Sequence, residues 1–102
     1  MAWIDAGLAS NLADGQASSI AVGRRMVAVV RSGETFYAIE DVCTHDGAEL
    51  TGGEIEGDEI ICPRHGARFC LRTGAALTPP AYEPVRVFEI KIENGHLWLR
   101  AD

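Results

Sequence analysis

Two short segments carry the strongest pattern in this sequence: Cys43-Thr44-His45-Asp46-Gly47 and Cys62-Pro63-Arg64-His65-Gly66. Each segment supplies one cysteine and one histidine, two residues apart in the first and three apart in the second. Thiolates and imidazoles are side chains that soft and borderline metals prefer, and so short a step lets one tight turn aim both at the same centre. The sequence therefore predicts a metal centre held by two loops, with four candidate ligands: Cys43, His45, Cys62 and His65.

The ligand set alone leaves two kinds of metal centre open. Two cysteines and two histidines can hold a tetrahedral zinc, and the chain would then be a zinc-stabilised interaction module. In the usual zinc arrangement, however, the paired cysteines come first and the paired histidines last, whereas here each segment offers one of each. Mixed pairs fit a centre with two different irons, one bound by thiolates and the other by imidazoles.

Strands and turns account for most of the remaining sequence. β-branched and aromatic residues at 26–31 and 35–39 flank Ser32-Gly33-Glu34, which predicts a hairpin. A second hairpin is predicted from 85–92 and 97–99, because the Asn-Gly pair between them is preferred in tight hairpin turns. The apolar residues of 85–92 change face near Val87 and Phe88, which predicts a β-bulge there.

Helical patterning is almost absent. The one candidate helix, Leu8 to Ala13, is short and ends at Asp14-Gly15. We therefore expect a nearly all-β chain. Two segments fit strands poorly, Asp41 to Gly53 and Cys62 to Gly66, and both carry candidate ligands.

Length and charge narrow the class of protein. A chain of 102 residues with 47% hydrophobic and 24% charged residues has the composition of one ordinary globular domain. With 9 Lys and Arg against 15 Asp and Glu, the formal charge of −6 argues against a nucleic-acid partner. No apolar run approaches the roughly 20 residues of a membrane-spanning helix, and the N-terminus lacks the pattern of a secretory signal. We expect a cytoplasmic protein that binds no membrane, with its three cysteines reduced.

The two segments resemble the ligand loops of the Rieske family, whose pattern is C-x-H, an intervening stretch and C-x-x-H, with glycine after each loop. The likeness is to the ferredoxin components of bacterial aromatic-ring-hydroxylating dioxygenases, and it covers essentially the whole chain. It includes four further stretches: Phe36-Tyr37-Ala38-Ile39, Arg68-Phe69, Thr73-Gly74 and Leu77-Thr78-Pro79-Pro80-Ala81, the last similar to the family's proline loop.

The resemblance implies a fold and a cofactor. The fold is an all-β antiparallel β-sandwich, a single Rieske domain over residues 1–102, with a small cluster-binding subdomain at about 42–80 inserted as two loops. The cofactor is one Rieske-type 2Fe-2S cluster. Cys43 and Cys62 would bind its inner iron, and His45 and His65 its outer iron near the surface.

The resemblance also implies a function. The chain would be an electron carrier and not an enzyme, taking electrons from a flavin-dependent, NAD(P)H-dependent ferredoxin reductase and passing them to a terminal oxygenase. The alternative is a tightly bound small Rieske subunit of a nitrite-reductase-like or oxygenase complex.

Departures from the wider family predict a low reduction potential. Respiratory-chain Rieske proteins carry an extra cysteine in each loop, where this chain has Ala48 and Arg64. They also place Ser and Tyr hydroxyls against the cluster and a ligand sulfur, where this chain has Ala67 and Phe69. Because donated hydrogen bonds stabilise the reduced state, we expect a potential at the low end of the Rieske range, about −150 mV.

The other polar residues receive weaker predictions. Cys70 lies outside both segments and is expected to be a partly buried free thiol without a function, and His96 to be an exposed turn residue. Glycines 47, 52, 53 and 66 are expected to serve turn geometry and close approach. A group of carboxylates is expected either to face a basic partner or simply to be solvated: Asp41, Asp46, Glu49, Glu54, Glu56, Asp58 and Glu59.

Overall fold

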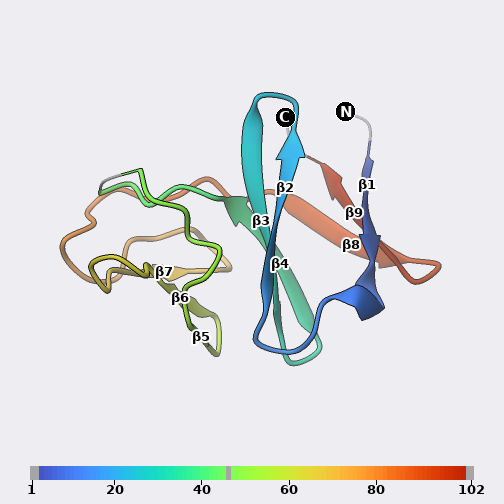
Figure 1. The fold of residues 1–102 in the computed structure, drawn as a ribbon, viewed down its shortest axis with the longest axis horizontal. Coiled ribbons are helices and arrows are strands. Elements are labelled where there is room, and N and C mark those ends of the chain that lie inside the picture. The colour runs from blue at the N-terminus through green and yellow to red at the C-terminus, as the bar shows by residue number, and fades with distance from the viewer. Residues whose placement is uncertain (1–2, 46, 101–102) are drawn as a thin grey trace.

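The computed structural model describes residues 3–45 and 47–100, and strands dominate them (Figure 1). The elements are β1 (Ile4–Leu8), the 3-10 turn η1 (Ala9–Asn11), β2 (Ala17–Val22), β3 (Arg25–Ser32), β4 (Thr35–Glu40), β5 (Ile55–Glu56), β6 (Glu59–Ile61), β7 (Arg68–Cys70), β8 (Glu89–Glu93) and β9 (His96–Arg100). The all-β prediction is confirmed, and the candidate helix at Leu8 to Ala13 is only the turn η1. Asp46 and the two residues at each end of the predicted domain 1–102 lie outside the described residues.

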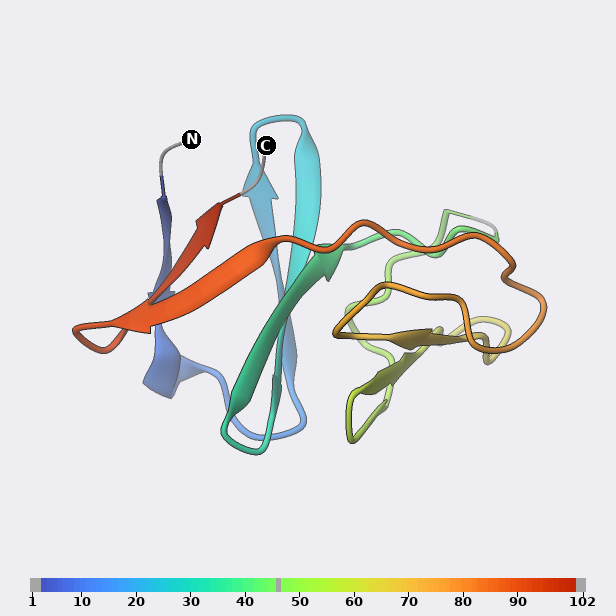
Figure 2. The same cartoon turned by 180° about the vertical axis from the view of Figure 1, so that it is seen from behind.

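The strands form three antiparallel sheets of three strands each, in the orders β1-β9-β8, β2-β3-β4 and β5-β6-β7. Seen from the front and from behind, β2-β3-β4 lies in the middle, with β1-β9-β8 on one side and β5-β6-β7 on the other (Figures 1 and 2). The third sheet and the loops beside it carry both candidate ligand segments.

The central strand of the middle sheet, β3, is buried on both faces from Val27 to Val30, which explains its continuous apolar run. Ala28 and Val30 belong to a core that includes Cys43 and Cys62, which we call the site core. Val27 and Val29 point the other way and pack with Leu97 and Leu99 of β9, in what we call the sandwich core. The candidate ligand segments therefore rest directly on the middle sheet.

Both predicted hairpins form. β3 and β4 pair with Ser32 opposite Thr35, so that Gly33 and Glu34 make the turn. β8 and β9 pair with Glu93 opposite His96, and the turn residues Asn94 and Gly95 have φ of 53° and 79°. Two successive positive φ values are what the favoured hairpin turn of Asn-Gly requires.

The predicted extent of the second hairpin is wrong, because β8 begins at Glu89 and not at Val85. The backbone of Val85 bonds to Gly74, and that of Phe88 bonds to Ala38. Val87 forms only an isolated bridge with Ile39. The apolar residues change face near Val87 because residues 85–88 run from the region of the ligand loops to the start of β8. In the sheet that contains β8 and β9, the register shift lies in the pairing of β1 with β9, between Asp5 and Leu8 of β1.

Within the described ranges, no helix has the length and apolar character needed to cross a membrane.

Candidate metal centre

The two candidate ligand segments adopt the same backbone turn. In the first ligand loop (residues 43–48), the Cys43 N–H donates to the Ala48 carbonyl at 2.7 Å and the Gly47 N–H donates to the Cys43 carbonyl at 2.8 Å. In the second ligand loop (residues 62–67), Cys62 bonds to Ala67 at 2.7 Å and Gly66 to Cys62 at 3.0 Å. Both closing glycines have positive φ, 79° and 76°, a conformation that glycine adopts without penalty.

The two histidines occupy different places in these matching turns, the third residue in one and the fourth in the other. As a result, the rings of His45 and His65 meet edge to face, with centroids 4.9 Å apart and planes at 85°. Both histidines are exposed. The structure thus brings the predicted histidines together at the surface.

The two cysteines, in contrast, are buried together in the site core. Cys43 and Cys62 are 0% and 1% exposed, and neither forms a disulfide. Within the described part of the chain, no three His, Cys, Asp or Glu side chains are placed to hold a single metal ion. A Rieske cluster asks for less, since each of its irons takes two protein ligands. Two buried thiols and two exposed imidazoles match that donor set.

A hydrogen bond ties the first ligand loop to the proline segment (residues 76–85). The Thr44 hydroxyl donates to the Glu83 carbonyl at 2.7 Å. In both overall views this segment runs beside the first ligand loop (Figures 1 and 2). Tyr82, next to Glu83, is 81% exposed. This hydrogen bond holds the first ligand loop against the proline segment.

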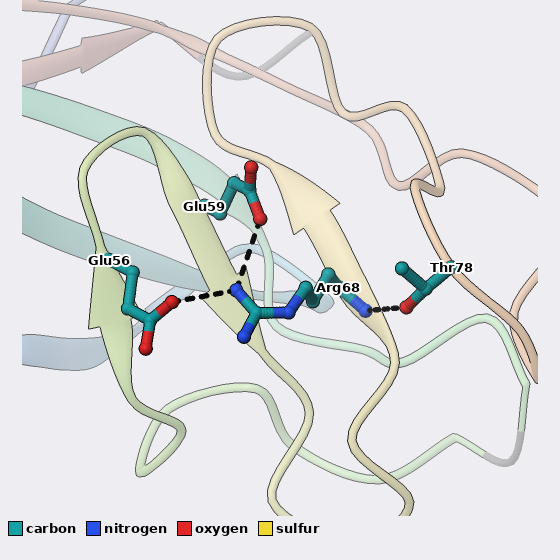
Figure 3. A network of polar contacts seen from close by, with 4 residues as sticks. All are labelled: Glu56, Glu59, Arg68 and Thr78. Atoms are coloured by element: carbon teal, nitrogen blue, oxygen red, sulfur yellow. Dashed lines mark hydrogen bonds and ion pairs between the residues drawn. The ribbon is translucent and has the colours of Figure 1, made fainter.

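Arg68 fastens the other end of the proline segment. Its backbone N–H donates to the Thr78 hydroxyl at 2.9 Å (Figure 3). Its carbonyl accepts a hydrogen bond from the Leu77 N–H at 2.8 Å. Its guanidinium reaches Glu56 at 2.9 Å and Glu59 at 3.2 Å. Hydrogen bonds to Glu56, and then to Glu59, raise the pKa of Arg68. One residue therefore links β5, β6, β7 and the proline segment.

Glycine at position 53 permits a close backbone approach. A Cβ there would overlap the carbonyl oxygen of Ile61 on β6. The sequence predicted that the glycines of this region allow a close approach to the cluster, whereas at Gly53 the close neighbour is the backbone of β6.

A third turn of the same kind follows at Cys70. The Cys70 N–H donates to the Ala75 carbonyl at 2.9 Å, and the Gly74 N–H donates to the Cys70 carbonyl at 2.7 Å. Cysteine, three residues, glycine and alanine thus occur three times, at 43–48, 62–67 and 70–75, a repeat that the sequence analysis missed. The third turn has no histidine. Instead, a hydrogen bond with Thr73 lowers the pKa of the Cys70 thiol, which is free and buried.

Asp41 is the residue that sequence reasoning placed wrongly. It was grouped with carboxylates expected at the surface, yet it is 2% exposed and accepts hydrogen bonds from Leu50 and Thr51. Asp41 is the first residue of the segment 41–53, which fits a strand poorly, and this position was the signal that the sequence offered. Glu49, Glu54 and Glu56 are exposed as expected, and Asp46 lies outside the described residues.

Fold and site together define a small β-protein of the iron–sulfur class, with two Cys/His loops packed on a three-stranded sheet. A family model described as "Rieske [2Fe-2S] domain" matches residues 2–89. The chain belongs to this family, and its cofactor is one Rieske-type 2Fe-2S cluster.

Individual relatives agree with the family assignment. The chain is 37% identical to ferredoxin CarAc of Metapseudomonas resinovorans over 98% of its own length and 94% of that protein. It matches the structure of the ferredoxin of carbazole 1,9a-dioxygenase from Nocardioides aromaticivorans IC177, with a TM-score of 0.94, 30% identity and full coverage of both chains. It also matches a chain in a complex of reduced oxygenase and oxidized ferredoxin in carbazole 1,9a-dioxygenase, with a TM-score of 0.89, 38% identity and coverage of 95% and 91%.

Proposed function

We propose that this chain is the ferredoxin of a multicomponent aromatic-ring dioxygenase system, an electron carrier and not itself an enzyme. It accepts electrons from a flavin-dependent, NAD(P)H-dependent ferredoxin reductase and delivers them to a terminal oxygenase. The observation that carries the proposal is the pair of exposed imidazoles, with ring centroids 4.9 Å apart, supplied by the same two loops as two buried thiols. The similarity to ferredoxins of dioxygenase systems along nearly the whole chain supports it.

Four residues hold the cofactor in this proposal, within a cluster-binding part at about 42–80. Cys43 and Cys62 bind the inner iron as thiolates from the site core. His45 and His65 bind the outer iron and present their ring edges to solvent. When bound, the cluster supplies a site that gains and loses one electron. The exposed rings give a docked partner a short route to that site, while the buried thiols keep water from the inner iron.

The carrier is expected to work at low potential. Ala67 and Phe69 are fully buried in the site core, and neither side chain has a hydroxyl to donate to sulfur. The net charge of −6 also opposes the added electron. A midpoint potential of about −150 mV follows, at the low end of the Rieske range. The proposed location is the cytoplasm, where three cysteines that form no disulfide stay reduced.

The first experiment is spectroscopic. Protein purified without oxygen is examined by visible absorption and by low-temperature EPR before and after dithionite, with iron and zinc analysis. We expect a red-brown protein with two irons per chain and a rhombic signal after reduction. Colourless protein with one zinc per chain would instead identify a zinc-stabilised interaction module and overturn the proposal.

A second experiment separates a free carrier from a fixed subunit. Gel filtration of the chain alone and with a purified reductase and oxygenase of a dioxygenase system should give separate peaks. With dioxygen and the aromatic substrate of that oxygenase present as electron acceptors, the mixture should oxygenate the substrate with electrons from NADH only when the chain is present. Co-elution as a permanent complex would favour the small-subunit alternative.

A further inference from the structure

Asp41 is a buried carboxylate with several hydrogen-bond donors around it. Its Oδ1 accepts the N–H of Leu50 at 2.7 Å and the N–H of Thr51 at 2.8 Å, and its Oδ2 lies 2.7 Å from the Thr51 hydroxyl. Aspartate is rarely buried to this degree unless a cation pairs with it. Among residues 3–45 and 47–100, no Lys, Arg or His side chain forms an ion pair with Asp41.

The three groups that bond to the Asp41 carboxylate can all act as donors. Backbone N–H groups only donate, so Oδ1 acts as a double acceptor, and the hydroxyl is free to donate to Oδ2. Bonds that N–H and O–H groups donate to a carboxylate are charge-assisted, and here they reach both of its oxygen atoms. Neutral donors satisfy its oxygen atoms, but they leave one full negative charge inside the protein.

This charge lies at the base of the first ligand loop. Asp41 is two residues before Cys43, and its own N–H is held by the Met26 carbonyl of β3 at 2.9 Å. One of its donors, Leu50, is fully buried in the site core that contains Cys43 and Cys62. The carboxylate therefore joins the beginning of the loop to its end, on the side where the thiols lie.

We propose that Asp41 is a positioning residue that also lowers the midpoint potential of the iron–sulfur centre through its buried charge. The inference rests on the proposed function, because it takes Cys43 as a ligand. Reduction adds one negative charge to the centre, and a fixed negative charge nearby makes that addition less favourable. Because Asp41 is shielded from solvent, salt and water screen this effect less than they screen a surface carboxylate.

The test compares midpoint potentials at one pH. Asp41→Asn removes the charge but keeps an oxygen that accepts from Leu50 and Thr51, so its potential should shift upward while its visible and EPR spectra stay Rieske-like. Thr51→Val removes the hydroxyl bond and keeps the charge, so its potential should not rise. Glu34→Gln removes an equal charge from the exposed turn between β3 and β4, where solvent and salt screen it, and should shift the potential much less than Asp41→Asn.

Each outcome decides the question. An Asp41→Asn protein with an intact cluster and an unchanged potential would overturn the inference. If that variant does not retain the cluster, Asp41→Ser provides a second neutral residue, smaller than Asn, with an oxygen atom that can accept a hydrogen bond. Loss of the cluster from both neutral variants, with retention in Thr51→Val, would overturn the electrostatic role and leave Asp41 a structural clamp. Absence of an iron–sulfur cluster from the unmodified protein would instead refute the proposed function.

Discussion

His45 and His65 meet at the surface although they occupy different positions in two otherwise matching turns. The proposal assigns both to the outer iron, and the identity of these side chains should therefore set the charge of the centre. His45→Cys replaces a neutral imidazole with a thiolate. We expect this variant to retain iron and to have a lower midpoint potential, because the centre becomes more anionic. Potentiometric titration followed by EPR measures the change.

His96 provides the matched control. It lies on β9, and its Nδ1 is 3.1 Å from Asp5 Oδ1 in the sheet on the far side of the molecule. His96→Asn should leave the potential and the EPR signal unchanged. A cluster-loaded His45→Cys protein with the potential of the unmodified chain would contradict the assignment of His45 as a ligand.

At the scale of elements, Thr44 joins the first ligand loop to the proline segment through its bond to Glu83. Thr44→Val keeps the shape of the side chain and removes the donor. We expect a loss of about 0.5–1.5 kcal/mol in the free energy of unfolding, the usual contribution of one hydrogen bond. We also expect faster bleaching of the cluster by a chelator, because the loop opens more often. Thr35→Val, an exposed threonine at the start of β4, is the control and should bleach at the unmodified rate.

Gly53 lies where the segment after the first ligand loop passes the backbone of β6. Gly53→Ala should destabilise the protein by about 1–3 kcal/mol, because the added Cβ overlaps the Ile61 carbonyl. The nearest atoms, from Ile61 and Leu50, belong to the backbone and cannot move aside as a flexible side chain would. Gly57→Ala is the comparison: its Cβ meets open space, and only its φ of 59° opposes the change. Chemical denaturation of the two variants measures the difference. Equal stability of Gly53→Ala and the unmodified chain would show that β6 can move away at this point.

The local elements were predictable from the sequence and the long-range ones were not. The Asn94-Gly95 hairpin and the glycine-closed ligand loops depend on turn geometry within a few residues, and the sequence encodes that directly. The segment from Val85 to Phe88 was misassigned because its partners, Gly74 and Ala38, lie in other elements. Asp41 looked like a surface carboxylate because its donors arrive from Leu50 and Thr51, nine and ten residues later.

At the scale of the whole molecule, the middle sheet separates the site core, which contains the two candidate cysteine ligands, from the sandwich core. Leu50, 0% exposed, belongs to the site core, and Leu97, 2% exposed, belongs to the sandwich core. Replacing either leucine by alanine should cost about 2–5 kcal/mol, because each leaves a cavity in close-packed surroundings. Thermal unfolding should therefore report similar losses of stability for Leu50→Ala and Leu97→Ala.

Cluster retention should distinguish the two variants. Leu50 packs with Cys43 and Cys62, so its truncation loosens the thiols themselves, whereas Leu97 reaches them only through the middle sheet. At a temperature where both variants remain folded, Leu50→Ala should lose its visible absorption to a chelator faster than Leu97→Ala. Equal rates would mean that the middle sheet transmits a defect from one face to the other. The ligand loops would then depend on the whole β-sandwich, and not only on the core beneath them.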